Sequence, residues 1–143
     1  SNSLFGKSND EARYIITGNN RDVNRYKWNY KNISKKLDNK NSKQSIFYQK
    51  ISNLLSVKRK QKAFHPNAAR HNMNLGSKIF SFKRVSINKK QTIICISNLS
   101  SKIQRVNLNK IYHNWKNLIG PKIEIKNKLL IVKPFETIWL SNR

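Results

Sequence analysis

LLSVKRKQKAFHPNAA, residues 54–69, contains the point at which the hydrophobic pattern of the chain changes. Before this stretch, from about Ser42, apolar residues recur at spacings of three and four up to Gln61, which predicts an amphipathic helix. Pro66 follows that helix, as is common after a helix end. Beyond it, short apolar segments alternate with turn residues, which favours strands. The sequence therefore predicts a helix that leads directly into a β domain.

The predicted helix carries signals at both ends and an apolar stripe along one side. Asn41 or Ser42 can cap its first turn. Basic residues between positions 58 and 62 complement the negative end of the helix dipole. The stripe consists of Phe47, Ile51, Leu54 and Leu55. Such a stripe needs a surface to pack against.

Short strands are expected throughout the region after His65. They are Asn72–Leu75, Lys78–Val85, Gln91–Ser97, Ile103–Leu108, Asn114–Leu118, Ile123–Ile125, Lys128–Lys133 and Thr137–Leu140. The strand Gln91–Ser97 is apolar on both faces, which favours a central position in a sheet. About eight short strands separated by turns suggest a small antiparallel sandwich or Greek-key sheet.

Residues 1–42 have a different character from the rest. They are rich in Asn, Ser, Lys and Gly and show no sustained helical or strand period, so we expect a long loop without structure of its own. The predicted fold class is α+β, with the loop and helix in residues 1–64 and an antiparallel all-β domain in residues 65–143.

The charge balance is extreme, with 30 Lys and Arg against 6 Asp and Glu and a net charge of +24. Taken alone, this balance favours a small basic nucleic-acid-binding protein, and we keep that function as the alternative. Lys is spread through almost every segment, however, and no aromatic residue is framed as in RNA-recognition strands. We therefore expect no specific nucleic-acid partner.

The number of cysteines and the hydropathy of the chain indicate the cellular compartment of the protein. The single cysteine, Cys95, excludes an internal disulfide, and its isoleucine neighbours predict a buried structural thiol. No apolar run reaches the roughly 20 residues of a membrane span, and the N-terminus lacks a signal-peptide pattern. We expect a cytoplasmic location without membrane contact. Because the chain begins SNSLFG without Met, we also expect a fragment or a processed product.

Several phrases of the chain resemble the C-terminal end of sucrose phosphorylase-like enzymes of glycoside hydrolase family 13, the α-amylase superfamily. They are SLFGKSND at 3–10, TGNNRDVNRYKW at 17–28, LLSVKRKQKAFHPNA at 54–68, QTIICISNLS at 91–100, NWKNLIG at 114–120 and KPFETIWLS at 133–141. They occur in the family's order and cover nearly the whole chain. The resemblance implies that residues 1–64 are the last loop and last helix of a (β/α)8 barrel. A complete barrel needs about 250 residues, so this chain cannot contain one.

The resemblance also implies an activity, which is transfer of an α-glucosyl group from sucrose or glucosylglycerate to phosphate. The α-glucoside and inorganic phosphate are the implied partners, no cofactor is needed, and the family's catalytic carboxylates lie upstream. No catalytic residue is therefore assigned, and the chain alone is expected to be inactive. By resemblance, Arg21 in the phrase GNNRDVNR is the implied substrate contact, with Asn20 standing where sucrose phosphorylases have Gly. The phrase leans toward the glucosylglycerate-type branch.

The titratable residues agree with this assignment. The six carboxylates, Asp10, Glu11, Asp22, Asp38, Glu124 and Glu136, contain no evident pair for retaining chemistry. For Asp22 we expect a structural pairing with Arg25. His65 follows the helix and is interpreted as part of a packed linker. His71 and His113 lack neighbours at metal-ligand spacing, so no metal site is predicted.

Overall fold

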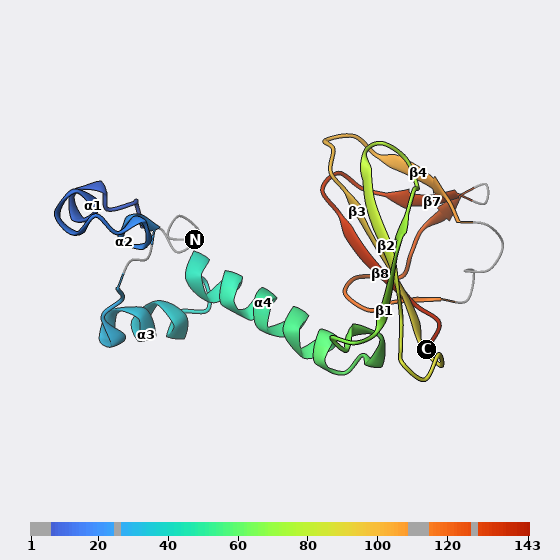
Figure 1. Ribbon diagram of the computed structural model, residues 1–143, viewed down its shortest axis with the longest axis horizontal. Helices are drawn as coiled ribbons and strands as arrows, with labels where there is room; N and C mark the ends of the chain where they lie inside the picture. The colour runs from blue at the N-terminus through green and yellow to red at the C-terminus, as the bar shows by residue number, and fades with distance from the viewer. Residues whose placement is uncertain (1–6, 25–26, 109–114, 127–128) are drawn as a thin grey trace. The chain divides into compact units, whose positions relative to one another are not determined.

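The computed structural model describes residues 7–24, 27–108, 115–126 and 129–143 (Figure 1). The chain divides into two compact units, Ser1–Leu55 and Ser56–Arg143. Within the described residues, none of the helices combines the length and the apolar character needed to cross a bilayer.

The first unit contains short helices where a loop was expected. They are α1 (Glu11–Thr17), α2 (Asn20–Asn24) and α3 (Tyr30–Asp38), followed by the start of α4 (Lys43–Arg59). The prediction of a structureless loop over residues 1–42 is therefore wrong for the described residues. Its polar residues act as helix caps: Asp10 Oδ1 accepts from the Arg13 N–H at 3.0 Å, and Asn29 caps α3. The helices α1 and α3 have only 7 and 9 residues, so an apolar period such as that of Tyr30, Ile33 and Leu37 is too short to stand out in the sequence.

Helix α4 confirms the predicted helix, with its ends close to those expected. Ser42 is the cap, because its hydroxyl oxygen accepts from the Ser45 N–H at 3.0 Å. In the apolar stripe, Phe47 and Leu54 are half-buried, while Ile51 is 40% and Leu55 50% exposed. Much of the stripe thus remains accessible to solvent.

The second unit is an antiparallel β domain, as predicted. After the short helix η2 (Lys62–Phe64) come β1 (Ala69–Met73), β2 (Ile79–Val85), β3 (Thr92–Asn98), β4 (Gln104–Asn107), β5 (Lys116–Asn117), β6 (Ile125–Lys126), β7 (Leu129–Val132) and β8 (Thr137–Ser141). The expected strand Asn72–Leu75 is displaced: β1 begins at Ala69, because pairing with Val85 of β2 extends the edge strand into a polar stretch without an apolar pattern. The expected hairpin turn at Lys126–Asn127 reaches beyond the described residues.

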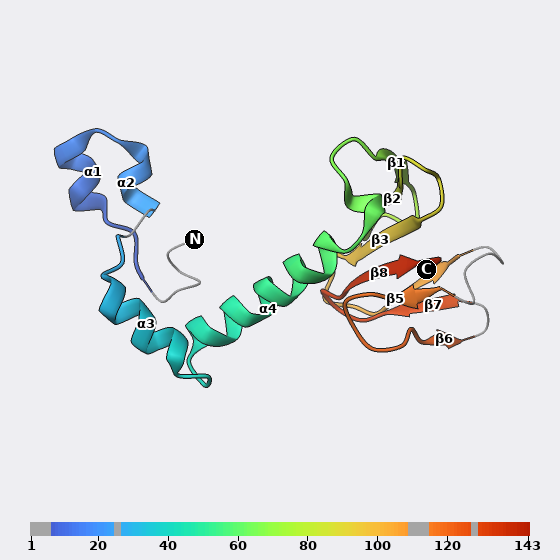
Figure 2. The ribbon, with the colours of Figure 1, turned by 90° about the horizontal axis from the view of Figure 1, so that it is seen from below.

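The strands form two sheets, one with the order β1-β2-β3-β8-β5 and one with the order β4-β7-β6 (Figure 2). Side chains from both sheets build the core between them: Ile94, Ile96, Val106, Leu130, Val132, Ile138 and Leu140. The central position predicted for Gln91–Ser97 is confirmed, since β3 lies between β2 and β8. The domain is therefore a sandwich closed on the inner face of the five-stranded sheet.

The outer face of the five-stranded sheet carries a second, smaller apolar cluster. Ile93 and Cys95 of β3 are buried there beneath Ala63 of η2. The Phe64 and Trp139 rings pack beside them with centroids 4.7 Å apart. Because successive residues of a strand face opposite sides, β3 supplies both clusters and is apolar along its whole length.

Candidate functional site

The phrase around Arg21 folds into the two consecutive helices α1 and α2. Gly18 ends α1 in the left-handed conformation, with φ at 63°, a backbone region that glycine adopts without strain. Asn19 then begins α2, because its Oδ1 accepts from the Arg21 N–H at 3.0 Å. Arg21 is exposed as the second residue of this helix. The local turn fixes the backbone of Arg21 and leaves its side chain at the surface.

An ion pair and a backbone hydrogen bond connect α1 to α2. The Arg13 Nε lies 3.7 Å from the Asp22 Oδ1. The Asp10 N–H donates to the Val23 carbonyl at 2.9 Å. The expected partner of Asp22, Arg25, lies outside the described residues, and the partner that the structure gives to Asp22 is Arg13. Asp22 thus serves to hold the two helices together.

Other carboxylates have structural contacts of the same kind. Asp10 caps α1, and the Glu136 Oε2 accepts from the Lys133 N–H at 2.7 Å in the turn before β8. In the described part of the chain, no three His, Cys, Asp or Glu side chains come together as a possible metal site. These carboxylates stabilise local backbone.

His65 lies at the end of η2, where the chain turns toward β1. Its Nδ1 accepts from the Asn67 N–H at 3.2 Å, and its carbonyl accepts from the Ala68 N–H at 2.9 Å. The side chain is exposed. His71 is an exposed residue of β1, and His113 lies outside the described residues.

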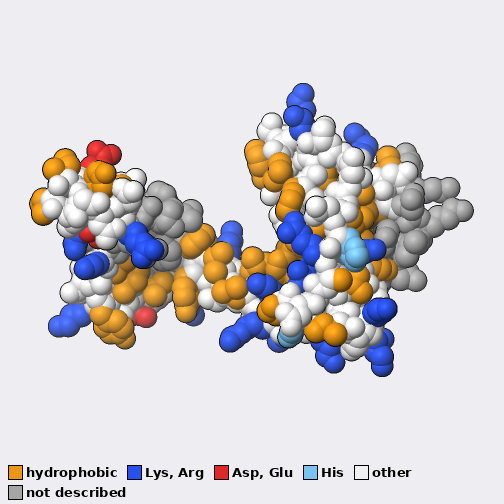
Figure 3. All heavy atoms as spheres, viewed as in Figure 1, with side chains coloured by type: hydrophobic (Ala, Val, Ile, Leu, Met, Phe, Trp, Pro, Cys, Tyr) orange, Lys and Arg blue, Asp and Glu red, His pale blue; other side chains and the backbone are white. Residues whose placement is uncertain are grey.

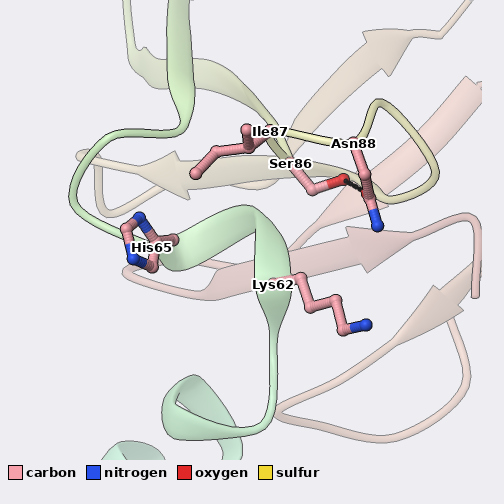
Figure 4. A pocket seen from close by; sticks show the side chains of 5 residues that line it. All are labelled: Lys62, His65, Ser86, Ile87 and Asn88. Atoms are coloured by element: carbon pink, nitrogen blue, oxygen red, sulfur yellow. Dashed lines mark hydrogen bonds between the residues drawn. The ribbon is translucent and has the colours of Figure 1, made fainter.

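A pocket of about 280 Å³ opens beside His65 (Figure 4). It is lined by Lys62, His65, Ser86, Ile87 and Asn88. The turn between β2 and β3 supplies one wall, where the Ser86 hydroxyl donates to Asn88 Oδ1 at 2.8 Å. Nothing in the sequence marked this pocket, because its two walls are more than 20 residues apart. The residues that line it include no carboxylate, so they offer no acid and base pair for glycoside chemistry.

Cys95 is buried in the outer-face cluster with 4% of its surface exposed. Burial raises the pKa of its thiol from 9.0 to about 12, and the nearby Arg84 guanidinium opposes part of that rise. A thiol with so high a pKa is not a nucleophile at neutral pH. The predicted buried structural role is therefore confirmed.

Almost the whole chain is similar in sequence to known proteins. The glucosylglycerate phosphorylase of Escherichia coli (strain K12) is 25% identical over 139 residues, which cover 97% of this chain and 24% of that protein. The glucosylglycerate phosphorylase of Spirochaeta thermophila is 28% identical over 98 residues, covering 68% of this chain and 17% of that protein. The chain thus spans about a quarter or less of these relatives. No family model matches it.

Solved structures show the same fold. An α-glucosyl transfer enzyme, XgtA, aligns with a TM-score of 0.56 and 14% identity over 77% of this chain and 19% of that chain. The α-amylase from H. orenii aligns with a TM-score of 0.55 and 17% identity over 77% of this chain and 22% of that chain. The resemblance predicted from the sequence phrases is confirmed: the chain is similar to the glucosylglycerate phosphorylases and shares its fold with enzymes of glycoside hydrolase family 13, the α-amylase superfamily.

Proposed function

We propose that this chain is the C-terminal region of a glucoside phosphorylase, which transfers an α-glucosyl group from glucosylglycerate or sucrose to phosphate. The observation that carries the proposal is the similarity to the E. coli glucosylglycerate phosphorylase over 97% of this chain. The sandwich supports it, since an aligned α-glucosyl transfer enzyme has the same fold. Glucosylglycerate is the favoured substrate because both curated relatives carry that name.

Residues 1–64 correspond, in this proposal, to the loop and helix that close a (β/α)8 barrel. The support comes from the apolar stripe of α4. Two of its four residues are exposed, Ile51 at 40% and Leu55 at 50%. Exposed apolar side chains on one face of a helix are typical of a surface that another part of a protein covers. The barrel would bury this stripe.

The bond-breaking groups are proposed to lie outside these 143 residues. A retaining mechanism needs two carboxyl groups about 5 Å apart, one as nucleophile and one as acid and base. Here Asp10 caps a helix, Asp22 pairs with Arg13, and Glu136 holds a turn. The contribution proposed for this chain is substrate binding through Arg21, whose guanidinium offers several donors in one plane to a glucosyl hydroxyl.

A chimera tests the proposal. The matched segment of the E. coli relative is replaced by this chain, and release of glucose 1-phosphate from glucosylglycerate and phosphate is measured. We expect turnover by the chimera and none by the isolated 143-residue chain. Turnover by the isolated chain, or a folded chimera without activity, would contradict the proposal.

Arg21 is tested in the same chimera. Loss of a charged hydrogen bond to substrate lowers kcat/KM by about ten- to a hundredfold, so we expect that fall for Arg21→Ala. Lys31→Ala is the matched control, because Lys31 is an exposed cation on the neighbouring helix α3. Equal effects of the two substitutions would remove Arg21 from the binding site.

Nucleic-acid binding is the alternative that the net charge of +24 raises. In the face that Figure 3 shows, Lys and Arg side chains are dispersed and do not gather in one patch. We therefore expect the chain to bind nucleic acid weakly and without distinguishing RNA from DNA. Fluorescence anisotropy with labelled RNA and DNA across a salt series is the measurement. Tight binding to one nucleic acid at physiological salt would favour the alternative.

A further inference from the structure

Residues 61–65, which form part of the connection from α4 to β1, lie on the outer face of the five-stranded sheet. Ala63 is fully buried against Ile93 and Cys95 of β3. Phe64 packs on Trp139 of β8. Connections between helices and strands are usually surface loops with few fixed contacts. This one is held as tightly as part of the core.

The side chain of Gln91 forms hydrogen bonds with residues 61 and 63 of the segment. Its side chain is 9% exposed, and its Oε1 accepts from the Ala63 N–H at 3.0 Å. Its Nε2 donates to Gln61 Oε1 at 2.7 Å and lies 3.4 Å from the Ser141 hydroxyl oxygen. One buried amide therefore uses both its acceptor and its donors to tie β8 to two residues of the segment.

The guanidinium of Arg84 in β2 forms hydrogen bonds with two carbonyls of the segment. Its Nε donates to the Ala63 carbonyl at 3.1 Å, and its Nη2 donates to the His65 carbonyl at 2.6 Å. The rigid planar guanidinium fixes the separation of these two carbonyls. Hydrogen bonds with a charged donor are also stronger than neutral ones.

We propose that Gln91 and Arg84 form a clamp that makes residues 61–65 part of the cooperative unit of the β domain, so that the end of α4 is anchored to the sheet. Ala63 receives both halves of the clamp, one on its N–H and one on its carbonyl. The clamp partners are 21 to 28 residues from Ala63 in sequence, so the anchoring forms only when the sheet forms. This inference rests on contacts within the chain itself and is independent of the proposed glucosyl transfer.

Hydrogen exchange of the Ala63 amide in the 143-residue chain tests the clamp. In Gln91→Ala the N–H loses its acceptor, and we expect its exchange to accelerate by about tenfold or more. Gln104→Ala is the matched control, since Gln104 is a half-buried glutamine whose amide bonds to Ser100. The control should leave Ala63 exchange unchanged. Unchanged exchange in Gln91→Ala would overturn the proposal.

Arg84→Ala provides an independent second test. We expect faster trypsin cleavage after Lys62, measured by mass spectrometry against cleavage after Lys31 in the same molecules. Arg105→Ala is its control, because Arg105 is an exposed arginine in β4 of the other sheet. The amides of Ile94 and Ile96 report whether the sheet remains folded. If both clamp variants speed up exchange in β3 as much as at Ala63, the substitutions destabilise the whole domain. That result would overturn the proposal.

Discussion

The two compact units are stabilised by contacts of different range. Among the described residues, the buried apolar side chains lie between Ala63 and Leu140, within the second unit. In the first unit, Ile15 is 81% and Ile16 85% exposed, and most hydrogen bonds join residues close in sequence. Polar caps mark the helix starts of the first unit, whereas a shared apolar core makes the second unit cooperative.

The largest change in stability is expected when an isoleucine of the second unit, and not one of the first unit, is truncated. Ile96 is fully buried between the sheets, so Ile96→Ala should lower the free energy of unfolding by about 2–5 kcal/mol. Ile15→Ala, at a side chain that is 81% exposed, should change it by less than about 0.5 kcal/mol. Urea denaturation followed by fluorescence measures both values. Similar losses for the two variants would show that the first unit has a core of its own.

A second prediction concerns pH and the outer-face cluster. The folded chain holds the Cys95 proton more tightly, because burial raises the pKa of the thiol from 9.0 to about 12. This contribution to stability is complete below pH 9 and is lost as the pH rises toward 12. Between pH 9 and pH 10 the free energy of unfolding should therefore fall by about 1 kcal/mol more in the native chain than in Cys95→Val. If the free energy of unfolding changes with pH in the same way in both proteins, this prediction is wrong.

A third prediction tests capping in the first unit. Asp10→Ala removes the acceptor of the Arg13 N–H and should destabilise α1 by about 1 kcal/mol. Exchange of the Arg13 amide measures the change. Asp38→Ala is the control, because Asp38 is an exposed carboxylate at the end of α3, outside α1. A matching change in the β3 amides would mean that the units are coupled, contrary to the comparison.

The smallest effect is expected for the ion pair of Arg13 and Asp22. Its 3.7 Å separation and the 44% exposure of the Arg13 side chain leave it screened by solvent. Arg13→Ala should therefore cost less than about 1 kcal/mol, and less still at high salt. Exchange of the α2 amides at two ionic strengths is the measurement. A large effect that does not depend on salt would indicate buried packing between α1 and α2.

Hydrophobic patterning predicted the elements whose apolar residues recur at a regular spacing. Spacing of Phe47, Ile51 and Leu54 predicted α4, and the double-sided apolar run predicted β3 as a central strand. The pattern failed where polar side chains determine the backbone. Asp10 and Asn29 cap helices of only 7 and 9 residues, and the polar start of β1 is fixed by its partner β2. Of the candidate site, the sequence phrases indicated Arg21, and its role stays a prediction.

The amino-acid sequence is sufficient to place the change from helix to antiparallel β domain, to predict that Cys95 is buried and to show which known enzymes the chain resembles. These properties follow from side-chain periodicity and from the order of local phrases, which neighbouring residues define. The contacts of Ala63 with Gln91 and Arg84, and the pocket that Lys62 shares with Asn88, depend on the folded sheet. The physical reason is that a polar side chain has many possible hydrogen-bond partners, and folding of the sheet selects among them residues that are distant in sequence.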